Sequence, residues 1–303
     1  MSRFIKRMTG LALLGLIVAW FLSSPTYVDP ETYDGLTGDV TAGAQVFYTG
    51  GCSSCHSAPD AKGEEKYVLA GGRQFATEFG TFVAPNISPD PDRGIGGWSV
   101  IDLANAMQMG VSPSGEHYYP AFPYSSYQRM APQDIADLHA YLKTIPASDR
   151  PSQRHKVAFP FDVRRTLGLW KLMFVKPGPV VSFDEPTGEL LRGQYLVEGP
   201  GHCGECHTPR NALGGLDYRK WLAGGPNPDG PGTIPNITDD PGGLADWSED
   251  DIAGYLKSGF RPDFDMASGA MADVIENLAR LPDSDRAAIA AYLKAVTAIP
   301  AAK

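Results

Sequence analysis

The sequence predicts a mostly helical protein in which two copies of one domain follow a single apolar helix at the N-terminus. Three observations lead to this prediction. An uncharged stretch lies near the start of the chain, and a pattern of about 150 residues then occurs twice. No convincing run alternates between apolar and polar residues, as a half-buried strand would. With 303 residues, of which 43% are hydrophobic, the chain has room for two folded domains.

The opening segment places three basic residues before an uncharged run from Met8 to Leu22. A helix over residues 4–24 is nearly long enough to cross a bilayer, and the basic end belongs on the cytoplasmic side. No Ala-x-Ala cleavage site follows, and Pro25 would obstruct cleavage after the apolar run. We therefore favour a retained signal anchor over a cleaved signal peptide. Residues 1–35 are expected to tether the chain to the cell membrane, with the remainder on the periplasmic side.

The repeated pattern contains a Gly-Gly step, a Pro-Asn-Ile loop, a Trp-Ser helix start and a closing helix that ends in Ala-Tyr-Leu-Lys. Each Ser is a favourable N-cap, and each short helix ends at a C-cap glycine. We predict domains over residues 36–150 and 186–303, with a linker of residues 151–185 that contains a short helix. The paired segments are Gly71-Gly72 and Gly224-Gly225, Pro85–Ile87 and Pro235–Ile237, Trp98-Ser99 and Trp247-Ser248, and Gly110 and Gly259.

All four cysteines lie in two copies of Cys-x-x-Cys-His, which is the attachment signature of c-type haem. The two thiols add to the haem vinyl groups as thioethers, and the histidine becomes the proximal iron ligand. A zinc site would more naturally pair two such motifs within one domain. The sequence thus predicts two covalently bound haem c groups in two tandem class I cytochrome c domains. The attaching residues are Cys52, Cys55, Cys203 and Cys206, and the proximal ligands are His56 and His207.

The second axial ligand of each iron is sought between the short helix and the closing helix. In the second domain Met271 lies 24 residues past Trp247, and Met266 is the alternative. A thioether ligand raises the potential, as suits an electron carrier.

The first domain has Phe122 at the position equivalent to Met271, and a phenyl ring cannot bind iron. Met130 is the nearest methionine in the right loop and is our predicted ligand. Alignment of the two repeats from their C-terminal ends matches Met130 with Leu281, which would suggest a core residue instead. His117 could instead give bis-His ligation, and the axial site could also be open.

Over about residues 36–300 the chain resembles the cytochrome c subunit of bacterial membrane-bound alcohol, gluconate and aldehyde dehydrogenases. The resemblance rests on the motifs above together with Gly96-Gly-Trp-Ser99 and His117-Tyr-Tyr-Pro-Ala-Phe-Pro-Tyr124. The resemblance implies that electrons arrive from a flavin, quinone-type or molybdenum subunit and leave to ubiquinone or a terminal acceptor. Two departures are clear. Those subunits typically have three haem domains, and many have Met where this chain has Phe122.

We expect a dihaem electron-transfer protein that relays electrons from a periplasmic dehydrogenase to a quinone, cytochrome or oxidase, without catalysis of its own. A dihaem peroxidase or thiosulfate dehydrogenase is the alternative, and a haem-based sensor ranks below it. The net charge of −9 argues against nucleic acid and against broad attraction to anionic lipid. Basic residues gather in the linker from Arg150 to Lys176. This cluster is expected to be either a solvated segment with haem-propionate contacts or a docking surface for an acidic partner.

Overall fold

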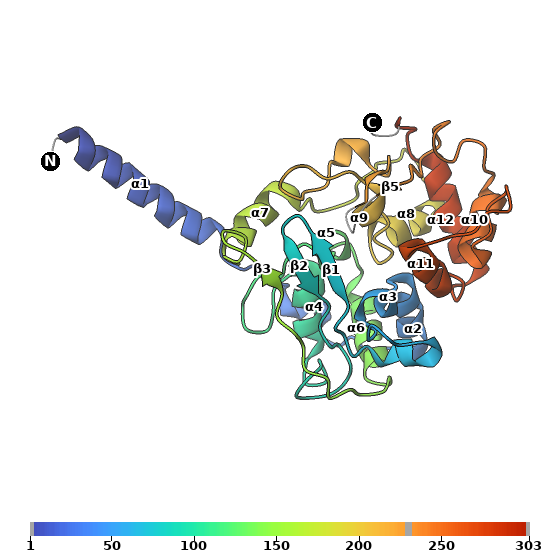
Figure 1. Cartoon of the computed structure of the whole chain (residues 1–303), viewed down its shortest axis with the longest axis horizontal. Coiled ribbons are helices and arrows are strands. Elements are labelled where there is room, and N and C mark those ends of the chain that lie inside the picture. The colour runs from blue at the N-terminus through green and yellow to red at the C-terminus, as the bar shows by residue number, and fades with distance from the viewer. Residues whose placement is uncertain (1–2, 228–231, 301–303) are drawn as a thin grey trace.

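The computed structural model describes residues 3–227 and 232–300, and it is mostly helical, as predicted. Helix α1 (Arg3–Leu22) projects away from the rest of the molecule (Figure 1) and buries none of its residues. It is long and apolar enough to cross a membrane, as either an anchor or a signal sequence would be. Helix α7 (Thr166–Phe174) lies in the linker, beside the C-terminal end of α1.

Corresponding helices occur in the same order before and after α7. The first half contains η1 (Pro30–Tyr33), α2 (Val40–Thr49), α3 (Cys52–His56), η2 (Gly63–Val68), α4 (Val100–Met109), α5 (Tyr124–Tyr127) and α6 (Pro132–Leu142). The second half contains α8 (Gly188–Glu198), α9 (Gly204–His207), η3 (Tyr218–Lys220), α10 (Glu249–Ser258), α11 (Ala270–Leu278) and α12 (Asp283–Ala295).

In each half the first long helix crosses the last one at a glycine. A Cβ atom on Gly43 of α2 would lie 2.0 Å from the carbonyl oxygen of Asp137 in α6. A Cβ atom on Gly193 of α8 would lie 1.9 Å from the carbonyl oxygen of Ala288 in α12. Both distances are far below van der Waals contact, so the two crossings bring backbone against backbone and require glycine.

The predicted helix ends are confirmed at α4 and α10. Ser99 and Ser248 are the N-caps, and each forms a capping box with the aspartate three residues later. Gly110 and Gly259 end these helices in the left-handed region, with φ of 58° and 77°.

Short strands were not expected from the sequence. Strands β1 (Gln74–Thr77) and β2 (Gly80–Val83) form an antiparallel hairpin, and β3 (Lys156–Val157) from the linker pairs with β2. Strands β4 (Gly225–Pro226) and β5 (Thr233–Ile234) pair in the second half. Strands of two to four residues are too short for an alternating pattern to be recognised. The three-stranded sheet ties the linker to the first half.

Each half has its own hydrophobic core, and the two cores meet. Phe47, Leu69 and Ile135 are fully buried in the first core, as are Leu196 and Tyr292 in the second. Tyr48, next to Phe47 on α2, packs against both cores. The two halves are therefore in direct apolar contact.

We predict that Gly43→Ala and Gly193→Ala each destabilise the protein, because the added methyl group meets a backbone carbonyl that cannot rotate away. The expected loss is about 1–3 kcal/mol, the usual cost of overpacking. Gly254→Ala is the control, since a Cβ atom there meets nothing within 4 Å in the middle of α10. That substitution should stabilise the helix by about 0.5–1 kcal/mol. Denaturant unfolding followed by circular dichroism measures all three, and equal effects at Gly43 and Gly254 would contradict the proposed crossing.

Candidate haem-attachment sites

The structure places each Cys-x-x-Cys-His motif on one helical turn. Helix α3 contains the whole motif from Cys52 to His56, and α9 begins directly after Cys203, its N-cap, and ends at His207. Residues separated by three or four positions lie on the same face of a helix. The two cysteines and the histidine of each motif therefore share a face, as attachment to one planar group requires.

A proline carbonyl orients each motif histidine. Nδ1 of His56 lies 2.9 Å from the carbonyl oxygen of Pro85, and Nδ1 of His207 lies 2.9 Å from that of Pro235. A carbonyl can only accept, so Nδ1 carries the proton and Nε2 keeps its lone pair. Burial lowers the pKa of both imidazoles, and the hydrogen bond to proline offsets part of that effect. Both rings are thus neutral near pH 7, with Nε2 available to iron. This donor set fits a c-type haem.

The proline loops are held close to the motifs by glycine. The amide nitrogens of Gly71 and Gly224 donate to the carbonyl oxygens of His56 and His207, each at 2.7 Å. Gly71 has a φ of 69° and Gly224 a φ of 72°, and a Cβ atom on either would overlap the proline loop. Glycine is therefore required at both positions.

A buried asparagine shapes each proline loop. Oδ1 of Asn86 accepts from the amide of Ser88 at 2.9 Å, while its Nδ2 donates to the carbonyl of Ser148 at 2.8 Å. Asn236 repeats the pattern with Thr238 at 2.8 Å and Ile299 at 2.7 Å. We identified the Pro-Asn-Ile repeat in the sequence without assigning it a role. In the structure the proline carbonyl orients the motif histidine, and the asparagine shapes the loop that presents this carbonyl.

In the second half, Met271 and Met266 have different surroundings. Met271, in the first turn of α11, is half-buried and packs against the same core as Cys203 and Trp247. Met266 is 58% exposed and forms an isolated β-bridge with Phe260. The structure thus packs Met271 and Cys203 against one hydrophobic core and leaves Met266 at the surface.

In the first half, Met130 belongs to the buried core against which Cys52 and Phe122 pack. Only 3% of Met130 is exposed, and its carbonyl accepts from Nε2 of Gln108 at 2.9 Å. A buried methionine in this core can serve either as a packing residue or as a ligand, and Met130 stays our predicted ligand.

His117 uses both ring nitrogens elsewhere. Its Nε2 lies 2.9 Å from the carbonyl oxygen of Ser23, and its Nδ1 lies 3.0 Å from Nζ of Lys171. Burial lowers the pKa of His117, so the ring is neutral, donates through Nε2 and accepts through Nδ1. Burial also lowers the pKa of Lys171 to about 7, and its amino group donates to the carbonyls of Met109 and Gly110. These contacts disfavour His117 as an axial ligand.

The two attachment helices pack reciprocally on the opposite halves. Ser53, between the cysteines of α3, donates through Oγ to Oδ1 of Asn277 in α11 at 3.1 Å. Glu205, between the cysteines of the second motif, accepts through Oε1 from Oγ of Ser126 in α5 at 2.9 Å. The segments that lead into the two motifs also touch, because Nε2 of His202 lies 3.2 Å from the carbonyl oxygen of Gly50.

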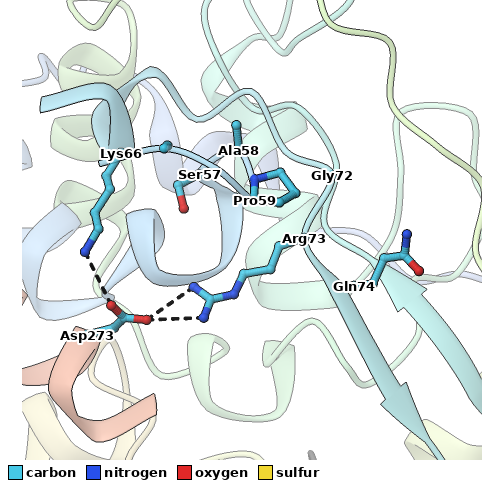
Figure 2. A pocket seen from close by; sticks show the side chains of 9 residues that line it. Ser57, Ala58, Pro59, Lys66, Gly72, Arg73, Gln74 and Asp273 are labelled. Atoms are coloured by element: carbon cyan, nitrogen blue, oxygen red, sulfur yellow. Dashed lines mark hydrogen bonds and ion pairs between the residues drawn. The ribbon is translucent and has the colours of Figure 1, made fainter. Parts of the chain in front are cut away.

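An ionic cluster fixes α11 against the first half. Asp273 of α11 accepts from both terminal nitrogens of Arg73 at 3.2 and 3.3 Å, and Nζ of Lys66 lies 3.4 Å from Oδ1 of Asp273 (Figure 2). Lys66 also pairs with Glu276 at 2.6 Å. The cluster borders an open hollow that Ser57 lines as well. Since Asp273 is two residues past Met271, first-half cations help to position the candidate ligand of the second half.

Comparisons with known proteins agree with this geometry. The family model for cytochrome c matches residues 40–146. A diheme cytochrome c-type protein of Cereibacter sphaeroides is 56% identical over 299 residues, which cover 99% of this chain and 100% of the relative.

Longer relatives are also similar. The cytochrome c subunit of a quinone alcohol dehydrogenase from Gluconacetobacter polyoxogenes is 37% identical, over 89% of this chain and 58% of the relative. The cytochrome c subunit of gluconate 2-dehydrogenase from Pantoea cypripedii is 36% identical, over 95% of this chain and 65% of the relative. The chain thus spans less than two thirds of the length of these two relatives.

We predict that His117→Gln changes stability and its pH dependence but not haem ligation. A neutral histidine with a lowered folded pKa contributes stability that is present above its unfolded pKa of about 6.5 and is lost as the pH falls through the folded value. Glutamine cannot titrate, so the difference in melting temperature between wild type and variant should narrow as the pH falls from neutral toward 5. Loss of a low-spin haem signal in the variant would show instead that His117 is a ligand.

Proposed function

The chain belongs to the dihaem c-type cytochromes, and we therefore propose that it is a membrane-tethered relay between a periplasmic dehydrogenase and the respiratory chain. It carries two covalently bound haem c groups and transfers electrons. In our proposal a dehydrogenase subunit is the donor, and a quinone, cytochrome or oxidase is the acceptor. The dehydrogenase cytochrome subunits among its relatives support a donor of this class.

The observation that carries the proposal is the contact between the two segments that lead into the attachment motifs. His202 precedes Cys203 and reaches the carbonyl of Gly50, two residues before Cys52. The ring of His202 also meets the ring of Tyr127 edge to face, with centroids 5.5 Å apart. Haem supplies one-electron chemistry when it is bound, and the polypeptide holds the segments that lead into its two attachment motifs in contact with each other. This arrangement favours two centres that work in series over two independent carriers.

Each half supplies its own ligands in this proposal. His56 and His207 are the proximal ligands, and their proline partners set the available nitrogen. Met130 and Met271 complete the two irons, supported by their places in the cores against which Cys52 and Cys203 pack. We assign the tandem class I cytochrome c domains to residues 36–150 and 186–303.

Contacts at the end of α1 support retention of this helix as an anchor. Ser23 is 3% exposed, and its carbonyl meets His117. Arg165 donates to the carbonyl of Trp20 at 2.7 Å and to the hydroxyl of Ser24 at 2.8 Å. Cleavage after Ser24 would remove all of these partners. A retained α1 places both halves on the periplasmic side.

The functional test isolates the tagged full-length chain from its own membranes in mild detergent. Primary alcohols, sugars, sugar acids and nicotinate are then added in turn while the α-bands of both haems are recorded. One substrate class should reduce both haems through a co-purified dehydrogenase, and quinone should reoxidise them. Reduction of neither haem by any class, together with hydrogen peroxide turnover or carbon monoxide binding, would contradict the relay and favour a dihaem enzyme.

We predict that Met271→Leu and Met130→Leu each remove one thioether ligand while two haems per chain remain attached. Each variant should lose one of two weak red absorption bands of ferric His/Met haem, and one reduction potential should fall, because a thioether favours Fe(II). Met266→Leu is the matched control and should change neither property, since Met266 is exposed. An unchanged spectrum in Met130→Leu would make Met130 a core residue only.

A further inference from the structure

The outer face of α7 and the segment before it expose apolar side chains. Leu172 and Met173, adjacent on α7, are 63% and 57% exposed, and Phe159 is 80% exposed. Phe161 and Val163 are exposed as well. The other sides of α7 are occupied. Lys171 points into the protein and donates to the carbonyls of Met109 and Gly110, Gly168 is buried against Ser23, and Trp170 donates through Nε1 to the carbonyl of Leu213 at 2.8 Å. A single helix therefore packs on the protein with one face and presents apolar groups to its surroundings with the other.

The same stretch of chain is strongly basic. Residues 150–176 hold seven of the 26 basic residues and one of the 35 acidic residues of the sequence. Arg154, Lys156 and Lys176 are exposed, while Lys171 is engaged inside the protein. The remainder of the chain is correspondingly acidic, so this stretch forms the basic part of an otherwise acidic molecule. The charge of the whole chain, which argues against anionic lipid, does not describe this stretch.

Helix α7 is joined directly to the end of the candidate membrane helix. The guanidinium of Arg165 lies 4.3 Å from the ring centroid of Trp20, and a Cβ atom on Gly168 would lie 2.3 Å from the carbonyl oxygen of Ser23. Tryptophan is enriched where a membrane helix leaves the hydrocarbon core. Figure 1 shows α7 and β3 beside this end of α1, with α10 on the opposite side of the molecule.

We propose that the outer face of α7, with Phe159–Val163, is a platform that lies on the bilayer surface. Leu172, Met173 and Phe159 insert among the lipid headgroups, and exposed basic side chains meet anionic phosphates. The proposal rests on the retained anchor of the proposed function, because α1 sets the depth of α7. A bilayer fits better than a protein partner, since the face adjoins the helix that enters the membrane. The platform fixes the orientation of the globular part and leaves the side that carries α10 open to the donor.

Site-directed spin labelling of the full-length chain tests the platform. All four native cysteines are consumed by thioether bonds, so an introduced cysteine is the only reactive thiol. Leu172→Cys carries the label on the platform, and Phe264→Cys, at a position 89% exposed between α10 and α11, is the control. Vesicles of phosphatidylcholine with phosphatidylglycerol receive each protein. The Leu172 label should collide more with oxygen, which enters lipid, and the Phe264 label more with a water-soluble nickel complex.

Equal nickel accessibility at the two positions, in protein that stays in the vesicles, would overturn the platform and leave the anchor intact. Protein that fails to remain with the vesicles would instead refute the anchor. If the Leu172 label were shielded from the nickel complex only when a dehydrogenase is added, the platform would also be overturned, in favour of a protein partner.

A second variant tests the charge. The double substitution Arg154→Glu with Lys156→Glu should reduce the oxygen preference of the Leu172 label in phosphatidylglycerol vesicles and not in pure phosphatidylcholine. Arg93→Glu with Lys143→Glu, at two exposed positions outside residues 150–176, matches the change in charge and should have no effect. If the oxygen preference of the Leu172 label fell equally in both lipids, or equally in both double variants, the proposed role of anionic headgroups would be overturned.

Discussion

Both attachment sites are organised around the hydrogen bond between the motif histidine and the carbonyl of a proline. The bond places the proton on Nδ1 and leaves the lone pair of Nε2 available, as the proposed role of each histidine as an iron ligand requires. Its geometry requires that the proline loop lie against the attachment helix. Gly71 and Gly224 permit that approach, and the buried Asn86 and Asn236 replace the hydrogen bonds that the loop backbone would otherwise lack.

The reciprocal contact between the halves adds a second constraint. Each attachment helix meets a helix of the opposite half, α3 with α11 and α9 with α5. Neither attachment helix is therefore packed by residues of one half alone. Two buried acids next to these contacts are paired locally. Glu205 pairs with Arg210 at 2.6 Å, and Glu198 accepts from the amides of Val180 and Val181. The second of these contacts secures the end of the linker to α8. Because each attachment helix is partly packed by the opposite half, the stability of one half is coupled to the stability of the other.

Sequence reasoning identified the parts whose chemistry is local. The cysteine motifs, the capping serines and the C-cap glycines all act within a few residues, so their patterns can be recognised in the sequence without knowledge of the fold. The hairpin of β1 and β2 was missed because its strands are too short to show alternation. The role of the Pro85 carbonyl could not be read from residue type, since every residue has a carbonyl. Only the repeat of Pro-Asn-Ile gave a signal. The engagement of His117 by Ser23 and Lys171 joins three distant segments and required the structure.

We propose that the two attachment sites lie close together. Electron paramagnetic resonance of the fully oxidised protein measures this directly, with the single-haem variants Cys52→Ala and Cys203→Ala as references. Two nearby ferric haems relax each other through their dipolar interaction. The spectrum of the dihaem protein should therefore saturate at higher microwave power than the sum of the two single-haem spectra. A spectrum equal to that sum, with unchanged saturation, would show that the haems are far apart despite the contact between His202 and Gly50.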